Sequence, residues 1–176
     1  MDNGSAYTGQ IEAALDGLGV AFEKTGPLEC APGRELGHSH VILSGRRRND
    51  RRANAVNSRI AREAARRGTR LLGICYGAEV MALALGGTIR RRGSPRRGKA
   101  TARVIRENPL CSGSLVVEES HSYEVARLPA GMSALAESDG CTNEMIGHHA
   151  APLFGTQFHP EASPDGRALL ARFCSL

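Results

Sequence analysis

Aromatic residues, paired cysteines and long apolar runs are all scarce in this chain, and each shortage argues against a class of function. Aromatic residues make up only 4% of the sequence, which leaves little material for a surface that stacks nucleic-acid bases. No apolar stretch approaches the roughly 20 residues of a membrane-spanning helix. The first residues lack the basic and apolar regions of a signal peptide, so we expect a cytoplasmic protein that does not contact membranes.

The cysteines follow no pairing pattern. No two of them form C-x-x-C, and no spacing of cysteine and histidine resembles a zinc site. Their number is odd, which argues against a disulfide framework in a protein expected to be cytoplasmic. Most free cysteines are small buried hydrophobic residues, so a cysteine with a chemical role must be recognised by its surroundings. The five are Cys30, Cys75, Cys111, Cys141 and Cys174.

Positive charge is concentrated in two arginine-rich runs, Arg46–Arg52 and Arg90–Arg97. The chain carries a net charge of +5. Such runs can contact nucleic acid or phosphate. Because aromatic residues are so few, the sequence favours solvated loops or a surface for an acidic partner over a nucleic-acid interface.

Helix-like and strand-like segments alternate in the first half, and short strand-like segments dominate the second. This pattern predicts one α/β domain over residues 1–176. We expect a doubly wound, mostly parallel sheet flanked by helices, with additional strands in the second half. The predicted helices are 7–18, 53–67, 76–85 and 164–173, and the predicted strands are 20–23, 40–44, 70–74, 101–106, 115–118, 133–137, 143–148 and 153–157.

The start of the chain departs from this pattern. A doubly wound domain normally opens with a buried strand, but residues 1–4 lead almost directly into the first predicted helix. Either that first strand is missing or the true start lies upstream.

The segment G-I-C-Y-G, residues 73–77, joins a predicted strand to a predicted helix. It matches the thiol version of a nucleophile elbow, in which a sharp, strained turn exposes the nucleophile. Glycines flank the nucleophile because side chains there would collide with neighbours. The helix N-terminus is expected to lower the pKa of the Cys75 thiol and to offer N–H groups to an oxyanion.

A second segment, Q-F-H-P-E at residues 157–161, supplies partners for this thiol. His159 and Glu161 are two residues apart, so both can reach the same side of an extended chain. A carboxylate can then orient the imidazole while the imidazole deprotonates Cys75. Each residue alone could be structural, as a buried thiol, a core histidine or a surface ion pair. The two motifs together favour a Cys-His-Glu triad.

These two motifs in this order resemble the class I (triad) glutamine amidotransferases, which have a flavodoxin-like fold. The likeness extends over nearly the whole chain. I-L-S-G at residues 42–45 resembles the strand that leads to their oxyanion loop, and S-H-S-Y-E-V at residues 120–125 resembles the S-H-x-D-x-V segment of the GMP synthetase glutaminase subunit. The archaeal-type subunit is the most similar in overall appearance.

The resemblance implies that L-glutamine is hydrolysed through a thioester and that ammonia passes to an ATP-pyrophosphatase-type synthase subunit. It implies no cofactor or metal in this chain, because ATP and magnesium would belong to the partner. By motif match, Cys75 is the nucleophile, His159 the base and acid, and Glu161 the orienting group. The match further assigns the oxyanion backbone to Gly45, Arg46 and Tyr76, and substrate binding to Gly73, Gly77, Glu79, His121, Ser122 and Tyr123.

Three positions differ from the family pattern. Arg46 replaces a glycine of the oxyanion loop, which removes glycine's conformational freedom there. Glu79 replaces a glutamine, and a carboxylate would suit an α-ammonium group but disfavour an α-carboxylate. Tyr123 stands at an Asp-like position that is thought to help couple the two halves of the synthetase.

These departures leave several functions open. The first is the glutaminase subunit of GMP synthetase, which supplies ammonia for the amination of XMP. The second is a subunit for another synthase, of anthranilate type or unassigned. The third is a weakly active regulatory homologue, which the altered positions favour and the intact triad opposes.

Overall fold

A seven-stranded mixed sheet forms the centre of the structure, a computed structural model that describes residues 1–30 and 37–176. The strand order is β1-β2-β7-β6-β5-β3-β4. The strands are β1 (His40–Leu43), β2 (Arg70–Ile74), β3 (Thr88–Val104), β4 (Ser114–Arg127), β5 (Met132–Ser138), β6 (Cys141–His148) and β7 (Leu153–Thr156). The helices are α1 (Thr8–Gly17), α2 (Arg51–Arg67), α3 (Tyr76–Ala84), α4 (Pro164–Cys174) and the short 3-10 helix η2 (Pro160–Ala162).

The parallel part of the sheet is confined to β1, β2 and β7. The other pairings, from β7 through β6, β5 and β3 to β4, are all antiparallel. The predicted α/β fold with additional strands in its second half is confirmed. The parallel share is smaller than we expected, because the short loops between the later strands cannot hold the crossover helices that parallel pairing requires.

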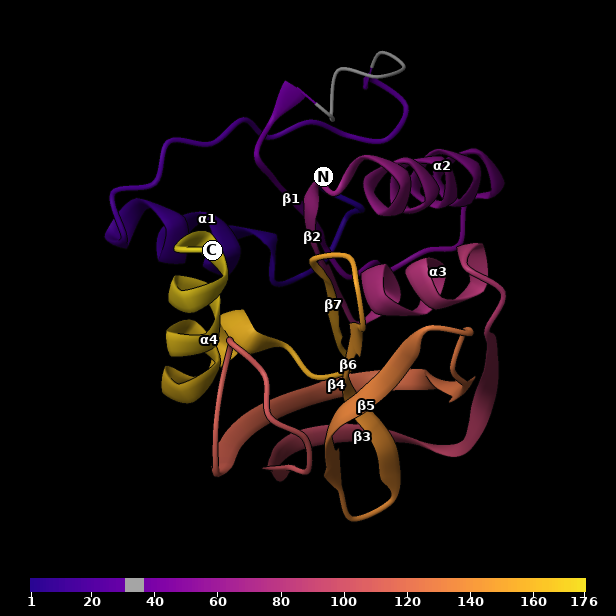
Figure 1. Cartoon of the computed structure of the whole chain (residues 1–176), viewed down its shortest axis with the longest axis vertical. Coiled ribbons are helices and arrows are strands. Elements are labelled where there is room, and N and C mark those ends of the chain that lie inside the picture. Colours follow the sequence, from indigo (N-terminus) through magenta and orange to yellow (C-terminus); the bar gives the residue numbers. More distant parts are fainter. Residues whose placement is uncertain (31–36) are drawn as a thin grey trace.

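Helices cover both faces of the parallel strands. Figure 1 shows α1 and α4 on one side of β1, β2 and β7, and α2 and α3 on the other. Successive side chains of a strand point to opposite faces, so β2 serves both layers. Leu72 and Ile74 pack with residues of α1 and α4, whereas Leu71 packs with residues of α2 and α3.

The start of the chain lies along the edge of β1. The Met1 ammonium nitrogen donates to the Ile42 carbonyl oxygen at 2.8 Å, and the Ser44 N–H donates to the Met1 carbonyl oxygen at 3.1 Å. On its other side, the Asp2 N–H donates to the carbonyl oxygen of Thr25. Residues 20–23 form no strand, so that prediction was wrong. The chain start stands between Thr25 and β1.

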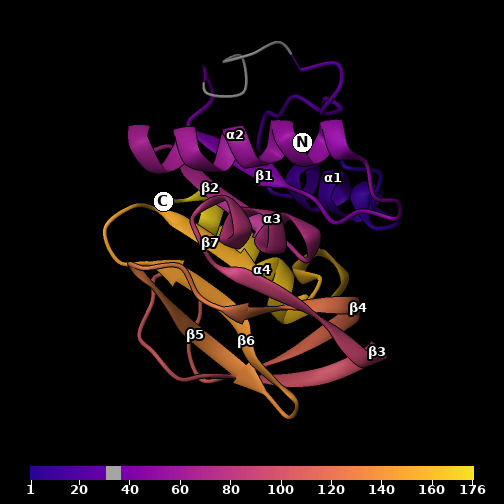
Figure 2. The ribbon, with the colours of Figure 1, turned by 90° about the vertical axis from the view of Figure 1, so that its right-hand side faces the viewer.

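The second arginine run is part of a strand and not the solvated loop that we expected. β3 begins at Thr88 and pairs along β4, and Figure 2 shows the two strands side by side. Side chains alternate across β3. Arg91 and Arg97 are exposed, whereas Arg92 and Arg96 form ion pairs with the buried carboxylates of β4. These ion pairs explain why so basic a segment can form a strand.

Candidate active site

Cys75 occupies a strained turn between β2 and α3. Its backbone has φ 51° and ψ −107°, and no other non-glycine residue that the structure describes has a positive φ. The flanking glycines permit the turn. A Cβ at Gly73 would lie 2.5 Å from the Gly77 carbonyl carbon, and one at Gly77 would lie 2.1 Å from the Leu43 oxygen. The structure thus assigns both glycines a steric role, and their contact with substrate stays a prediction.

The surroundings of Cys75 favour the thiol over the thiolate. Burial is the main cause that raises the pKa of Cys75, and the negative charges of Glu79 and Glu161 raise it further. The backbone N–H of Tyr76 and the Arg46 charge act in the opposite direction and are outweighed. The sequence predicted a lowered pKa from the helix N-terminus, and that prediction was wrong because burial dominates.

His159 and Glu161 form a buried pair at the end of β7. Nδ1 of His159 lies 2.8 Å from Oε1 of Glu161, and the two residues are 3% and 1% exposed. The backbone N–H of His159 donates to the Glu118 carbonyl oxygen of β4 at 2.8 Å. With Nδ1–H donating to the carboxylate, Nε2 is left free to accept a proton.

Two further residues touch the His159 imidazole. The ring of Tyr7, at the start of α1, stacks on it with centroids 4.1 Å apart. A Cβ at Gly45 would lie only 3.1 Å from Cε1 of His159, so the predicted oxyanion loop runs directly beside the imidazole. Sequence reasoning missed the role of Tyr7, because nothing in the local sequence links it to a histidine so far along the chain.

Arg46 is fixed against the first turn of α3. Its guanidinium carbon lies 3.9 Å from the centroid of the Tyr76 ring, and Nη1 donates to Oδ1 of Asn54 at 2.6 Å. The Tyr76 hydroxyl donates to the same oxygen at 2.8 Å. The φ of Arg46 is not positive, so the lost glycine freedom at this loop position causes no backbone strain.

Glu79 is buried one helical turn after Cys75, with 5% of its surface exposed. Burial raises the pKa of its carboxyl group, and the hydrogen bond from Gln157 opposes this shift. Nε2 of Gln157 lies 3.2 Å from Oε1 of Glu79 and 4.0 Å from Sγ of Cys75. The amide of Gln157 therefore contacts both groups. The motif at residues 157–161 contains Gln157, but nothing in the local sequence predicts these contacts.

The predicted substrate segment of β4 turns one side chain inward. His121 is buried, with Nδ1 2.7 Å from the Tyr123 carbonyl oxygen and Nε2 3.3 Å from Oε2 of Glu119. Burial alone would lower the pKa of His121, but Glu119 and the Tyr123 carbonyl outweigh it and the pKa is raised. Arg96 of β3 forms an ion pair with Glu119. The side chains of Ser122 and Tyr123 are exposed.

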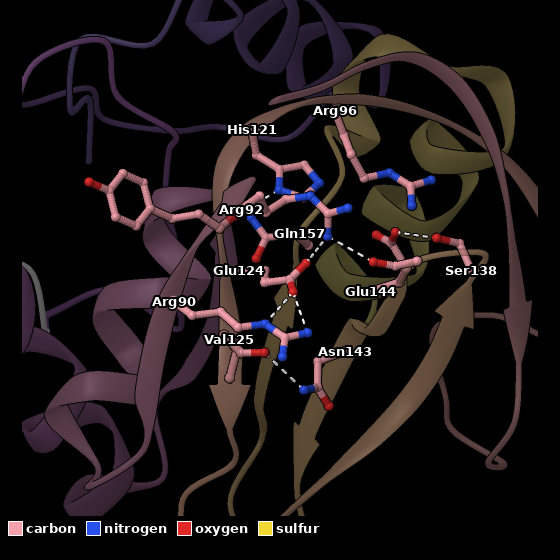
Figure 3. A network of polar contacts seen from close by, with 12 residues as sticks. Arg90, Arg92, Arg96, His121, Glu124, Val125, Ser138, Asn143, Glu144 and Gln157 are labelled. Atoms are coloured by element: carbon pink, nitrogen blue, oxygen red, sulfur yellow. Dashed lines mark hydrogen bonds and ion pairs between the residues drawn. The ribbon is translucent and has the colours of Figure 1, made fainter. Parts of the chain in front are cut away.

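Arginines of β3 hold a second buried carboxylate of β4 (Figure 3). Arg90 lies 2.6 Å from Oε1 of Glu124, and Arg92 forms an ion pair with Oε2. Burial would raise the pKa of Glu124, but the hydrogen bonds from both arginines hold it below its usual range. The backbone around His121 is thus anchored from both ends by ion pairs to β3.

Glu144 on β6 completes this network (Figure 3). It is fully buried, and burial raises the pKa of its carboxyl group to about 7, which the hydrogen bond from Ser138 opposes. The hydroxyl of Ser138 donates to its Oε1 at 2.6 Å. The backbone oxygen of Glu144 accepts from the N–H of Gln157 at 2.7 Å. The network thus reaches the residue beside Glu79.

Residues 1–30 and 37–176 contain no group of three or more His, Cys, Asp or Glu side chains arranged to hold a metal ion. No helix in the same described ranges is long and apolar enough to cross a membrane.

A cavity of about 210 Å³ lies among α1, β1 and the chain start, and none of its lining residues belongs to the predicted site.

Comparison with known proteins identifies the family. The model of the family described as glutamine amidotransferase class-I matches residues 1–175. The chain belongs to this family. It is 31% identical to a subunit of the glutamine-hydrolysing GMP synthase of Methanocaldococcus jannaschii, over 100% of this chain and 95% of the relative. The corresponding subunit of Thermococcus kodakarensis is 32% identical, over 93% of this chain and 88% of the relative.

Two solved structures share the fold. A candidate GMP synthase subunit from Thermoplasma acidophilum superposes with a TM-score of 0.84 at 26% identity, over 99% of this chain and 90% of that one. A glutamine amidotransferase from Thermotoga maritima gives 0.74 at 20% identity, over 86% and 70%, which is a likeness of fold alone.

Most residues predicted from the sequence gather at the carboxyl ends of the parallel strands. Direct contacts connect them into two sets, one around Cys75 and one around His159. The Glu161 charge acts on the Cys75 thiol and so links the two sets. The side chains of Ser122 and Tyr123 stand apart from both sets, so their contact with glutamine stays a prediction. The gathered residues are Gly45, Gly73, Cys75, Tyr76, Gly77, Glu79, His159 and Glu161, with Arg46 and His121 beside them.

Proposed function

We propose that this chain is the glutaminase subunit of a GMP synthetase and supplies ammonia for the amination of XMP. One observation carries the proposal: a cysteine in a strained strand-to-helix turn shares its site with a buried His159–Glu161 pair. Membership of the class I family supports it, as do relatives of nearly the same length whose names make them subunits of GMP synthase.

In the proposed reaction, the Cys75 sulfur attacks the side-chain amide carbon of glutamine after giving its proton to His159. His159 then delivers this proton to the leaving nitrogen, and ammonia departs from a glutamyl thioester. Water, deprotonated by His159, attacks the thioester carbon and releases glutamate. Glu161 keeps Nδ1 of the imidazole occupied, so that Nε2 handles the proton in each step.

Backbone N–H groups would stabilise the tetrahedral intermediates of both steps. The N–H of Tyr76 already points at the Cys75 sulfur, and the Gly45–Arg46 backbone runs beside His159. One such donor typically contributes about 10²–10³-fold to the rate. The buried Glu79 carboxylate suits the α-ammonium group of glutamine. The segment His121–Tyr123 would hold the α-carboxylate group of glutamine.

The partner is proposed to be an ATP-pyrophosphatase-type synthase subunit that holds ATP and magnesium. The exposed guanidinium groups of the loop after β1 and of the first turn of α2 make no ion pair with any residue that the structure describes. They follow the carboxyl end of a parallel strand, where ligands of such sheets bind. We infer that they meet an acidic surface of this partner, and a cytoplasmic location follows from that role. These groups are Arg47, Arg48, Arg51 and Arg52.

A synthase other than GMP synthetase is the second candidate. Tyr123 favours it, because this side chain is 43% exposed at the position where the family resemblance expects an Asp that couples the two halves. An exposed aromatic residue would fit a differently shaped partner surface.

Purification of the chain with its natural partner tests the proposal. We expect a complex that converts XMP, ATP and glutamine into GMP. The matched control is the complex with Cys75→Ser, which should still make GMP from ammonium salts but lose the glutamine-dependent reaction. Recovery of a different synthase would refute the GMP assignment and leave the glutaminase standing.

A further inference from the structure

Glu79 and Cys75 are held together in the first turn of α3. The backbone N–H of Glu79 donates to the Cys75 carbonyl oxygen at 3.0 Å. The amide of Gln157 lies against both side chains, 3.2 Å from Oε1 of Glu79 and 4.0 Å from Sγ of Cys75. A change of charge on either group is therefore felt by the other, because both residues are buried.

The Glu79 charge opposes the effect expected from the helix. The N-terminus of a helix carries partial positive charge, which favours a thiolate at its first residue. A carboxylate in the same turn cancels that effect, because two negative charges close together in a buried site repel strongly. Arg46 is the nearby cation, but it is held by Asn54 and the ring of Tyr76, and its effect on Cys75 is smaller than that of Glu79.

Glu79 has no cationic partner of its own. Within the described residues it forms no ion pair with lysine or arginine, and the hydrogen bond that its side chain accepts comes from a neutral amide. Buried carboxylates are normally paired, since an uncompensated charge in an apolar interior is costly. A cationic group of a ligand would complete this arrangement.

We propose that Glu79 is a charge gate: its carboxylate adds to the effect of burial and keeps Cys75 in the thiol form until the α-ammonium group of an amino-acid ligand binds to it. Neutralised in this way, the site lets Cys75 pass its proton to His159, and the thiolate forms only when substrate is present. Under the proposed function this ligand is glutamine. The charge gate rests on the proposed function only for the identity of its ligand.

The groups that face the gate come from every element packed around it. Gln157 at the end of β7, Arg46 in the loop after β1 and His121 on β4 act on Glu79. Glu161 in η2 and the N–H of Tyr76 act on Cys75. Arg46 and His121 are the cations among these groups, and neither forms an ion pair with Glu79 in the part of the chain that the structure describes, so the ligand is the group that changes the charge.

Titration of the Cys75 thiolate tests the gate directly. The ultraviolet absorbance of the thiolate is followed against pH. The absorbance of the Cys75→Ser variant is subtracted, which removes the contribution of the other four cysteines. We expect Glu79→Gln to increase the thiolate fraction at a given pH by about tenfold, which corresponds to about one pKa unit. Glu79→Asp retains the charge and should titrate like the unmodified protein, as should Glu63→Gln on α2, which pairs with Arg66 and Arg67.

The same titration with added ligands is an independent test that needs no variant. L-norvaline carries an α-ammonium group and no amide to hydrolyse, and pentanoate differs from it only by lacking that ammonium. Norvaline should increase the thiolate fraction of the unmodified protein about tenfold, and pentanoate should not. Equal effects of the two ligands would overturn the gate, as would an unchanged titration in a folded Glu79→Gln. If this variant does not fold, the titration with the two ligands decides alone.

Glutamate release, measured on the same preparation with its partner, separates the gate from the proposed function. Thiolate shifts without glutamate release would leave the gate standing and refute the glutaminase. Glutamate release without thiolate shifts would refute the gate alone.

Discussion

The ring of Tyr7 stacks on the imidazole of His159, with centroids 4.1 Å apart and the planes inclined by 26°. Glu161 holds one nitrogen of the same imidazole at 2.8 Å, and Gly45 leaves room beside its Cε1. The orientation of the proposed base therefore depends on α1, the loop after β1 and η2 together.

Removal of the Tyr7 ring should slow glutamine hydrolysis by loosening the imidazole. We expect Tyr7→Leu to lower kcat up to about tenfold, since an aromatic stack contributes about 0.5–1.5 kcal/mol. KM should change less. Tyr7→Phe keeps the ring and should keep kcat, so an equal loss in both variants would contradict a role for stacking. Glutamate release by the complex measures both.

Loss of the Glu161 charge should be far more damaging. Glu161→Gln keeps the size of the side chain but no longer favours the Nδ1–H form of His159, and we expect kcat to fall by about 10³–10⁴-fold. Glu118→Gln is the matched control, because Glu118 contacts His159 only through its backbone oxygen. Near-normal turnover in Glu161→Gln would remove this residue from the proposed mechanism.

The turn at Cys75 depends on a close backbone approach that stability measurements can test. A Cβ at Gly77 would lie 2.1 Å from the Leu43 oxygen. We expect Gly77→Ala to lower the free energy of unfolding by about 2–3 kcal/mol in urea titrations. Gly9→Ala in α1 meets nothing within 4 Å and should be neutral or slightly stabilising. A neutral result for Gly77→Ala would show that the turn relaxes.

The ion pairs of Glu124 should make stability depend on acid pH. Its pKa is depressed in the folded protein, so its contribution is present above the pKa of the unfolded chain, about 4.3, and is lost as pH falls through the folded value. Arg92→Met should lower the free energy of unfolding at pH 7 by about 2 kcal/mol.

Two comparisons check this interpretation. The difference between Arg92→Met and the unmodified protein should shrink as the pH falls below about 4. Arg91→Met, on the exposed face of β3, should change little at any pH. A penalty for Arg92→Met that does not vary with pH would point to lost packing and not to the ion pair.

Charge reversal in the loop after β1 should weaken partner binding without harming the thiol site. We expect Arg47→Glu with Arg48→Glu to weaken binding of the synthase subunit by about tenfold or more at low salt, with a smaller effect at high salt. Arg106→Glu, in the exposed loop after β3, is the control for charge reversal in a different loop. Loss of fold in the double variant, seen by circular dichroism, would show instead that the loop is structural.

The thiol turn was predictable from the sequence because local geometry dictates its residues. Glycines at 73 and 77 are required by backbone contacts within the turn, and the strand and helix around Cys75 follow from their apolar patterns. The pairing of His159 with Glu161 follows in the same way from their spacing of two residues.

Contacts between distant segments were not predictable in this way. The pKa of Cys75 depends on how deeply the turn is buried, which no local pattern reveals. The length of β3 depends on Glu119 and Glu124, which neutralise its arginines only once β4 has paired with it. The side-chain contact between Gln157 and Glu79 likewise joins two elements that are far apart in the chain.

Covalent labelling of Cys75 by a glutamine-like diazo-ketone tests the central claim most directly. The reagent is added to the complex with the partner and its nucleotides, and the modified peptide is identified by mass spectrometry. We predict one adduct, on Cys75, that excess glutamine prevents and that Cys75→Ser abolishes. Absence of an adduct, or an adduct on another of the five cysteines, would contradict the account.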